Sequence, residues 1–193
     1  MNKKLGWLLG LLALVLLIGG ASVLYNRMSA EAAPPPVAAA PTETETTEEA
    51  VEPVAAPDFT ALDSEGNSVQ LSDYLGTPVI LNFWASWCSP CKSEMPDFDA
   101  AYQQYGDEIQ FMMVNMTDGG QETLESAKDF IAESGYSFPV FFDTEYSAAM
   151  AYGVSSIPAT YFVNAEGNLV AYGIGPLVLE ALETGIGMLQ GSG

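Results

Sequence analysis

The feature that most constrains the fold is a pair of cysteines, Cys88 and Cys91, placed between an apolar segment and a helix. The preceding residues 78–84 (PVILNFW) are almost continuously apolar, as expected for a central strand covered on both faces. The following residues 89–105 have helical spacing and end at Gly106. This order predicts that Cys88 lies at the start of a helix, directly after a core strand.

The position of the cysteines favours redox chemistry. At a helix N-terminus, the unpaired backbone N–H groups and the helix dipole favour an anion, so a thiolate at Cys88 is stabilised. Cys91 lies one turn further on, close enough for an intramolecular disulfide, and Pro90 lies in the first turn, where its missing N–H costs little. A structural disulfide with so small a loop stabilises little. Half of a metal site is the other interpretation, but the chain has only two cysteines and no histidine to complete a zinc site.

The charge composition excludes several classes of function. The formal net charge is -20, and of five cations only Lys92 and Lys128 lie beyond Arg27. Phosphate binding needs clustered Lys and Arg, so a nucleic-acid role is excluded. The absence of histidine also excludes Ser-His-Asp and Cys-His catalytic sites and His-ligated metals.

The N-terminus carries an export signal. Residues 5–24 form an uncharged apolar run long enough to cross the membrane as a helix, and Lys3 and Lys4 before it predict a cytoplasmic N-terminus, residues 1–4. A cleaved signal peptide, with residues 30–32 (AEA) as the cleavage site, is the alternative. No cysteine follows the run, which excludes a lipoprotein anchor. Both interpretations place the remaining chain outside the cytoplasm, and the anchor is the preferred one.

Two further regions follow the anchor. Residues 25–57 are rich in Pro, Ala, Glu and Thr and show no hydrophobic periodicity, which predicts an extended, disordered stalk. Residues 58–193 are predicted to form the folded domain.

The folded domain is predicted to be an α/β domain with a mixed sheet. Alternating apolar runs and turn residues predict strands at residues 59–62, 68–71, 78–84, 109–115, 138–142, 159–163 and 169–172. Helical spacing predicts helices at residues 89–105, 122–134, 145–152 and 176–189. Strands alternate with helices first and a hairpin follows, so helices should cover both faces of the sheet.

At this point the sequence resembles a known family. Residues 84–92 (WASWCSPCK) resemble the active-site run of thioredoxins, and residues 58–190 resemble the TlpA/ResA branch of that superfamily. The supporting motifs are residues 57–59 (PDF), 82–84 (NFW), 94–96 (EMP), 153–160 (GVSSIPAT) and an insertion around 122–143. The resemblance implies a thioredoxin fold with an N-terminal β-hairpin and a strand–helix insertion. It also implies disulfide reduction or exchange outside the cytoplasmic membrane.

The resemblance assigns roles to individual residues. It makes Cys88 the attacking thiol and Cys91 the resolving, more buried thiol, with their disulfide in place of any cofactor or metal. Ile157 and Pro158 match the cis-proline loop that lies against the cysteines, and an X–Pro bond makes the cis form accessible. Glu94 matches an acid near the thiols and is one turn from Cys91 on the predicted helix. A solvated surface position for Glu94 is the alternative.

Other positions around the cysteines concern proton transfer and substrate binding. Asn82 stands where thioredoxins have a buried acid, so proton transfer would pass to Glu94 or to water. Trp84 and Trp87 flank the cysteines, and we expect Trp84 to pack in the core and Trp87 to bind substrate. Pro90 and the proline loop are expected to share that substrate surface.

The predicted function is reduction of disulfides in exported proteins, apocytochrome c among them, with electrons from a membrane thiol carrier of the CcdA/DsbD type. The dipeptide between the cysteines lacks the histidine of strongly oxidising relatives, which favours a reductant. A redox-silent binding module is the alternative. A peroxiredoxin is disfavoured because Ala85 replaces the required Thr or Ser and the predicted domain has no arginine.

Overall fold

The computed structural model describes residues 38–39 and 53–191 of the 193-residue chain. The predicted segments 1–4 and 5–24 lie outside the described residues, as does most of the predicted stalk. Within the described part, no helix has the length and apolar character needed to span a membrane.

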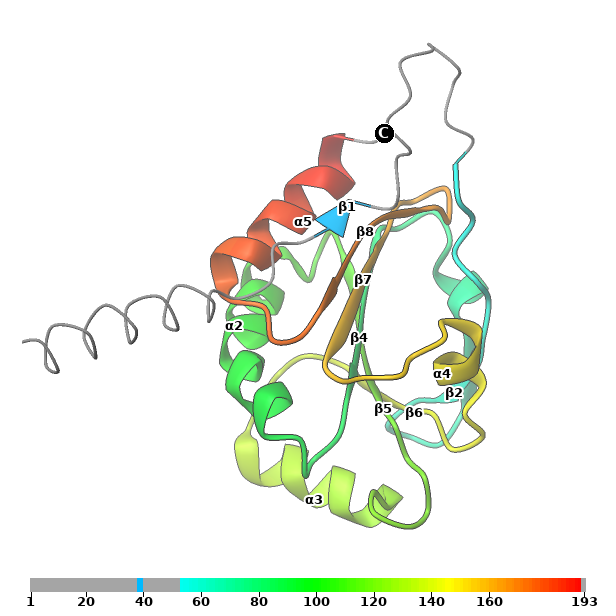
Figure 1. The fold of residues 1–193 in the computed structure, drawn as a ribbon, viewed down its shortest axis with the longest axis vertical. Coiled ribbons are helices and arrows are strands. Elements are labelled where there is room, and N and C mark those ends of the chain that lie inside the picture. The colour runs from blue at the N-terminus through cyan, green and yellow to red at the C-terminus, as the bar shows by residue number, and fades with distance from the viewer. Residues whose placement is uncertain (1–37, 40–52, 192–193) are drawn as a thin grey trace, which may run out of the picture. The chain divides into compact units, whose positions relative to one another are not determined.

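One mixed sheet organises the described residues (Figure 1). Its strand order is β1-β8-β7-β4-β5-β6-β2-β3. The central strand β4 pairs in parallel with β5 and antiparallel with β7. The strands are β1 (Ala38–Ala39), β2 (Thr60–Leu62), β3 (Ser68–Gln70), β4 (Val79–Trp84), β5 (Gln110–Asn115), β6 (Val140–Phe142), β7 (Ala159–Val163) and β8 (Leu169–Ile174).

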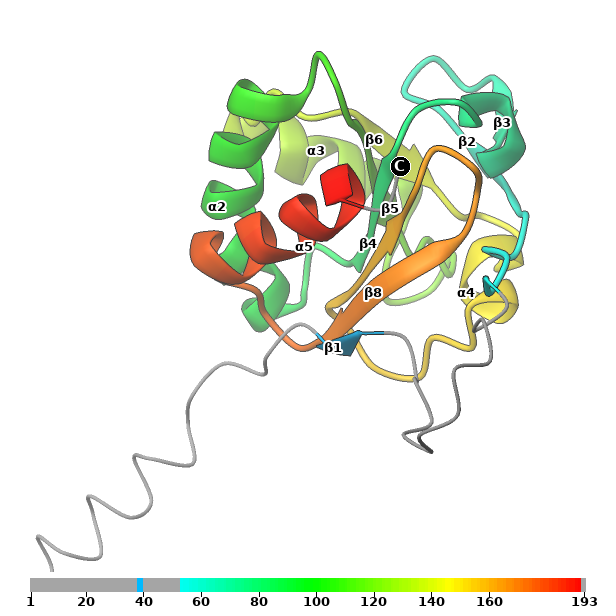
Figure 2. The same cartoon turned by 90° about the horizontal axis from the view of Figure 1, so that it is seen from above.

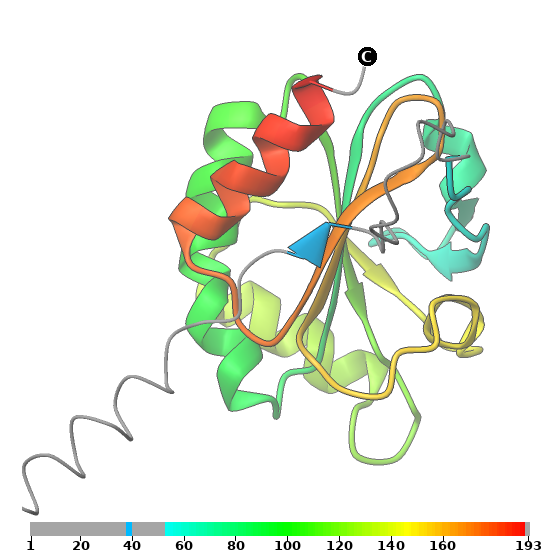
Figure 3. The same ribbon diagram turned by 45° about the horizontal axis from the view of Figure 1, so that its top comes forward.

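Helices cover both faces of the sheet, as predicted. The helices α2 (Ser89–Tyr105), α3 (Leu124–Ser134) and α5 (Leu179–Gly191) lie on one face, whereas the 3₁₀ helix η1 (Leu71–Tyr74) and α4 (Ser147–Ala151) lie on the other (Figure 2 and Figure 3). Each face has its own apolar cluster, which centres on Phe98 and Leu182 under α2 and α5 and on Phe59 and Leu71 opposite.

Strand β4 is buried along its whole length, which explains its unbroken apolar sequence. Ile80 and Trp84 face the cluster under α2 and α5, and Leu81 and Phe83 face the other cluster. Asn82 belongs to the same alternating set as Ile80 and Trp84, so its amide points toward α2.

The strand β6 and helix α3 form the predicted insertion. β6 pairs in parallel with β5 and, through Leu62 and Phe142, antiparallel with β2. The hairpin of β2 and β3 is thereby joined to the main sheet at this edge.

The sheet extends into the region predicted to be a disordered stalk. Ala38 and Ala39 pair with Tyr172 and Ala171 of β8. Further on, Val54 accepts a hydrogen bond at its carbonyl from the backbone of Leu169, and Ala55 forms a bridge with Asn168. Backbone pairing with the hairpin therefore begins before residue 58, the predicted start of the folded domain.

Three helices begin later than predicted: α4 begins at Ser147 and not at residue 145, and side-chain contacts explain the starts of the other two. α3 begins after Thr123, whose Oγ1 accepts a hydrogen bond from the backbone of Ser126 and caps the helix. α5 begins after Leu177, whose backbone N–H donates to the carboxylate of Glu94 instead of entering a helix. The helix over residues 89–105 has the predicted limits.

Two glycines of α5 provide a matched test of the packing. A Cβ at Gly185 would lie 2.3 Å from the ring of the buried Phe162, whereas a Cβ at Gly187 would meet nothing within 4 Å. We expect Gly185→Ala to lower the free energy of unfolding by about 1–3 kcal/mol through overpacking. Gly187→Ala should raise it by up to about 1 kcal/mol through helix propensity. Urea denaturation of both variants checks this, and equal effects would contradict the close approach.

Candidate active site

The two cysteines form an intramolecular disulfide at the N-terminus of α2, as predicted. The S–S distance is 2.07 Å. Cys88 is the N-cap residue of α2, and the backbone N–H of Cys91 donates to Cys88 Sγ at 3.2 Å. Cys88 is 4% exposed and Cys91 is fully buried. The sulfur nearer to solvent therefore lies where a helix N-terminus favours negative charge.

The predicted proline loop lies against the disulfide. The Ile157–Pro158 peptide bond is cis, which confirms that part of the prediction. Cys88 Sγ lies 3.9 Å from the carbonyl oxygen of Ile157. The carbonyl of Pro158 accepts a hydrogen bond from the backbone of Gly175, which ties the loop to the end of β8. Segments far apart in sequence thus meet at Cys88.

Glu94 is buried beneath the cysteines, so the alternative of a solvated surface position is wrong. It is 2% exposed. Its Oε1 accepts from Asn82 Nδ2 at 2.9 Å, and its Oε2 accepts from the backbone of Leu177 at 2.8 Å. The Asn82 amide also donates to Thr160 Oγ1 at 3.0 Å. The carboxyl group therefore joins β4 to the segment before α5, and the Asn82 amide links β4 to β7.

Burial gives Glu94 an acidity suited to proton transfer. Removal from water raises the pKa of Glu94 from 4.5 to about 7, although the hydrogen bonds from Leu177 and Asn82 lower it. A carboxyl group of this kind can both accept and release a proton near neutral pH. It lies one helical turn from Cys91.

Glu122 is a second buried carboxyl group, which the sequence did not identify as part of the site. It is fully buried. It accepts hydrogen bonds from the backbone N–H and the hydroxyl of Ser86, at 2.9 and 2.7 Å, and from the amide of Asn115. Glu122 therefore holds the loop before Cys88 against the end of β5. Its one sequence signal is that it precedes Thr123, a good helix cap, and so lies outside the helix.

The two tryptophans differ in burial, and Trp84 packs in the core as predicted. Trp84 is fully buried and packs against Phe130, with ring centroids 5.8 Å apart. Trp87 is 48% exposed and lies beside the disulfide loop. Pro90 is exposed at the start of α2.

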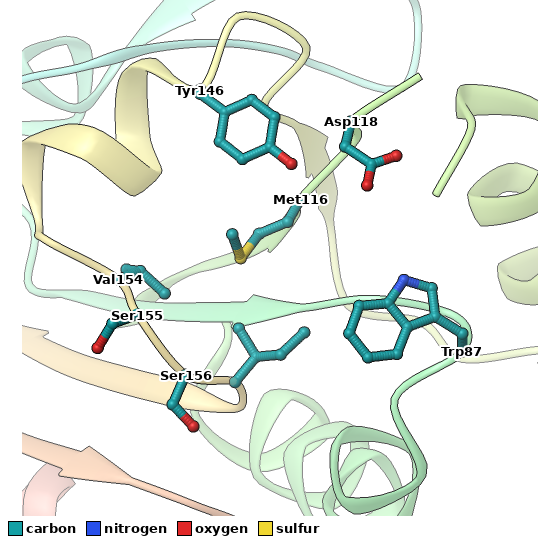
Figure 4. A pocket seen from close by; sticks show the side chains of 8 residues that line it. Trp87, Met116, Asp118, Tyr146, Val154, Ser155 and Ser156 are labelled. Atoms are coloured by element: carbon teal, nitrogen blue, oxygen red, sulfur yellow. The ribbon is translucent and has the colours of Figure 1, made fainter. Parts of the chain in front are cut away.

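A pocket opens next to the disulfide loop (Figure 4). Its volume is about 170 Å³. It is lined by Trp87, Met116, Asp118, Tyr146, Val154 and Ile157, among others. Ile157 is shared between this pocket and the surroundings of Cys88, so the pocket borders the reactive sulfur.

The described residues contain no group of three or more acidic or cysteine side chains placed to hold a metal ion.

Comparisons with known proteins agree with this site. The model of the AhpC/TSA family matches residues 54–172. Thiol-disulfide oxidoreductase ResA of Bacillus thuringiensis (strain Al Hakam) is 33% identical over 129 residues, which are 66% of this chain and 72% of that protein. The chain belongs to the AhpC/TSA family and is a ResA-like thiol-disulfide oxidoreductase. The predicted enzyme class and family are confirmed.

Two solved structures show the same fold. StoA from Bacillus subtilis is 29% identical with a TM-score of 0.60, and the match covers 69% of this chain and 99% of StoA. The pneumococcal exposed lipoprotein thioredoxin Etrx1 from Streptococcus pneumoniae strain TIGR4 is 33% identical with a TM-score of 0.60, over 67% of this chain and 98% of Etrx1. A ResA-like oxidoreductase of this fold works through a redox-active cysteine pair, which here is Cys88 and Cys91.

The role of Glu122 can be tested by removing its acceptor atoms. Glu122→Ala leaves one buried donor of Asn115 and two partly buried donors of Ser86 without partners, so we expect a loss of about 3 kcal/mol in the free energy of unfolding. Glu122→Gln should cost much less, because Oε1 still accepts and the Ser86 hydroxyl can accept from the new amide. Urea denaturation measures both. Glu133→Ala, at an exposed position of α3, is the control. Equal losses for the Ala and Gln variants would contradict this account.

The acidity of Glu94 predicts how stability depends on pH. Between pH 4.5 and about 7 the unfolded chain loses the Glu94 proton, whereas the folded oxidised protein keeps it. The folded state then binds more protons, so the free energy of unfolding falls as pH rises through this window, by up to about 3 kcal/mol. Glu94→Gln should remove this fall, because its amide does not titrate in this window. The variant should still fold, since the amide NH2 can donate to a reoriented Asn82 side chain and the amide oxygen can accept from the backbone N–H of Leu177.

Denaturation of the oxidised protein at several pH values between 4 and 8 checks this expectation. Glu108→Gln, at an exposed position beyond α2, should keep the wild-type slope. Parallel curves for wild type and Glu94→Gln would show that Glu94 does not titrate in this range.

Proposed function

We propose that this enzyme is an extracytoplasmic disulfide reductase of exported proteins, held at the membrane by residues 5–24. The observation that carries the proposal is the Cys88–Cys91 disulfide at a helix N-terminus, with a buried carboxyl group of pKa about 7 one turn away. This arrangement provides a nucleophile, a resolving thiol and a proton acceptor in one place.

In the first step, the reduced enzyme uses Cys88 as the nucleophile. Its thiolate attacks one sulfur of a substrate disulfide, forms a mixed disulfide and releases the other substrate sulfur as a thiolate. Cys88 is suited to this role because its sulfur is the less buried of the pair and accepts the N–H of Cys91. The backbone donor and helix dipole stabilise the negative charge before attack.

In the second step, Cys91 resolves the mixed disulfide. Glu94 accepts the proton of the Cys91 thiol, and the resulting thiolate attacks Cys88 Sγ. This forms the Cys88–Cys91 disulfide and releases the second substrate thiolate. Two electrons pass from the enzyme to the substrate disulfide, and the enzyme ends in the oxidised form described above. Asn82 takes no proton itself but holds Glu94 in place through its amide.

A further thiol donor must return the enzyme to the reduced form. We propose a membrane thiol carrier of the CcdA/DsbD type, because the electrons must reach a domain outside the cytoplasm. The preference for reduction rests on the Ser-Pro dipeptide between the cysteines, which has no histidine to stabilise the reduced thiolate strongly.

The location and the client proteins are also part of the proposal. The apolar run of residues 5–24 after Lys3 and Lys4 supports a membrane anchor with the domain outside. The name of the similar pneumococcal protein, an exposed lipoprotein thioredoxin, agrees with an extracytoplasmic site of action. Exported thiol proteins, including apocytochrome c, are the proposed clients, and Trp87, Pro90, Ile157 and Pro158 form the proposed substrate-binding surface.

Variants of the two cysteines test the proposed roles. Cys91→Ser should leave Cys88 able to form mixed disulfides that persist, because no resolving thiolate is present. Cys88→Ser should abolish both exchange and trapping. Non-reducing electrophoresis of membranes from cells expressing each full-length variant, followed by mass spectrometry, measures the trapped species and identifies clients. Adducts that form through Cys91 in Cys88→Ser would reverse the assignment, and adducts confined to cytoplasmic proteins would contradict the location.

A further inference from the structure

We infer that the pocket beside Cys88 is a subsite for a lysine or arginine side chain next to the disulfide of the substrate. The inference rests on the proposed function, since it adds a specificity to the same site. The occupant is identified by three features of the pocket, which are its apolar floor, its aromatic walls and its one carboxylate.

The floor and walls fit a long aliphatic stem that ends in a cation. Met116, Val154 and Ile157 contribute apolar atoms to the lining. The rings of Trp87 and Tyr146 face the same space from two different segments (Figure 4). Lysine and arginine side chains pack their methylene groups on apolar surface, and their charged heads are attracted to aromatic faces.

Asp118 supplies the charge that selects a cation. Its carboxylate lies near the Tyr146 phenol at the edge of the pocket (Figure 4). Asp118 Oδ1 accepts hydrogen bonds from the backbone N–H groups of Gly120 and Glu122, at 2.7 and 2.8 Å. These bonds hold the pKa of Asp118 below its usual range, so the group is ionised at neutral pH. Oδ2 takes no part in these two bonds.

The described part of this chain does not supply a cation to Asp118 itself. Its two lysines, Lys92 and Lys128, lie over the rings of Phe130 and Phe142, at 6.0 and 5.5 Å from the ring centroids. Neither forms a salt bridge with Asp118 within residues 53–191. Within residues 53–191 Asp118 therefore has no cationic partner, and its carboxylate is open to a cation on a bound molecule.

The backbone at Tyr146 supports a role in binding. With φ 56° and ψ 20°, Tyr146 has a left-handed conformation. This conformation is unfavourable for a bulky residue, and strained positions of this kind cluster at functional sites. Here it places the phenol ring at the pocket instead of in a helical turn. Burial and then the negative charges of Asp118 and Asp143 raise the pKa of Tyr146.

The pocket lies close enough to Cys88 for its occupant to be part of the same substrate that reacts there. Ile157 lines the pocket with its side chain, and its carbonyl oxygen lies 3.9 Å from Cys88 Sγ. A substrate whose cysteine sulfur is at Cys88 thus places a neighbouring residue at the pocket. The subsite would therefore select substrates by the residue next to their disulfide and not by the disulfide itself.

The test uses disulfide-linked peptides that differ at one residue next to the cysteine. Lysine, norleucine and glutamate are compared, in one series before the cysteine and in one after it, since norleucine keeps the lysine stem without the charge. The second-order rate constant for oxidation of the reduced full-length protein is measured. In one of the two series we expect the lysine peptide to react about tenfold faster than the norleucine peptide, and the glutamate peptide to be slowest.

Variants separate the subsite from the general acidity of the protein. In Asp118→Asn and in Tyr146→Leu the lysine-to-norleucine ratio should fall toward one, since the first removes the charge and the second the aromatic face. Asp107→Asn removes an exposed carboxylate beyond the far end of α2 and should keep the wild-type ratio. Equal rates for lysine and norleucine, or equal losses in Asp118→Asn and Asp107→Asn, would overturn the subsite alone. A reduced protein that no peptide oxidises would overturn the proposed function as well.

Discussion

The complete burial of β4 is the constraint on which the rest of the structure depends. A strand with all its residues buried needs cover on both faces, and this brings α2, α3 and α5 to one face and η1 and α4 to the other. The chain leaves β4 at Trp84 and must turn at once into α2. Cys88 is placed at that turn, so the reactive sulfur lies at the edge of the core and at a helix N-terminus at the same time.

One buried carboxyl group, Glu122, holds this turn, another, Glu94, lies in the helix that follows it, and their partners differ. Glu122 accepts from a backbone N–H, a hydroxyl and an amide, which fits a group that holds a loop in place. Glu94 has one donor at each oxygen, and burial raises its pKa to about 7. Removing Glu122 would free the loop before Cys88, whereas in the proposed mechanism changing Glu94 would remove the proton acceptor of Cys91. Similar burial thus fixes the position of a loop in one case and, in the proposed mechanism, supports acid–base chemistry in the other.

Much of the fold could be predicted because the signals are local. Unbroken apolar runs, glycines at turns and the helical spacing after Cys88 identify β4, β7 and α2 without knowledge of tertiary contacts. The burial of Glu94 could not be predicted in this way, since its partners Asn82 and Leu177 are far from it in sequence. The same holds for Glu122 with Ser86, and for the pairing of Ala38 with β8 in a segment of disordered composition. Each of these depends on long-range backbone or side-chain partners that composition does not encode.

Because the protein is strongly acidic, the Cys88 thiolate depends on donors close to it for its stability. Diffuse carboxylates act on a thiolate through solvent, and their effect fades beyond a Debye length of roughly 8 Å at physiological ionic strength. The N–H of Cys91 lies 3.2 Å from Cys88 Sγ, well inside that distance and shielded from water by burial. An acidic surface can therefore coexist with an anionic nucleophile, because the stabilising donor is close and fixed. The surface carboxylates can then interact with the bound substrate instead of the thiolate. In the proposed subsite, Asp118 is the carboxylate that favours cationic substrates.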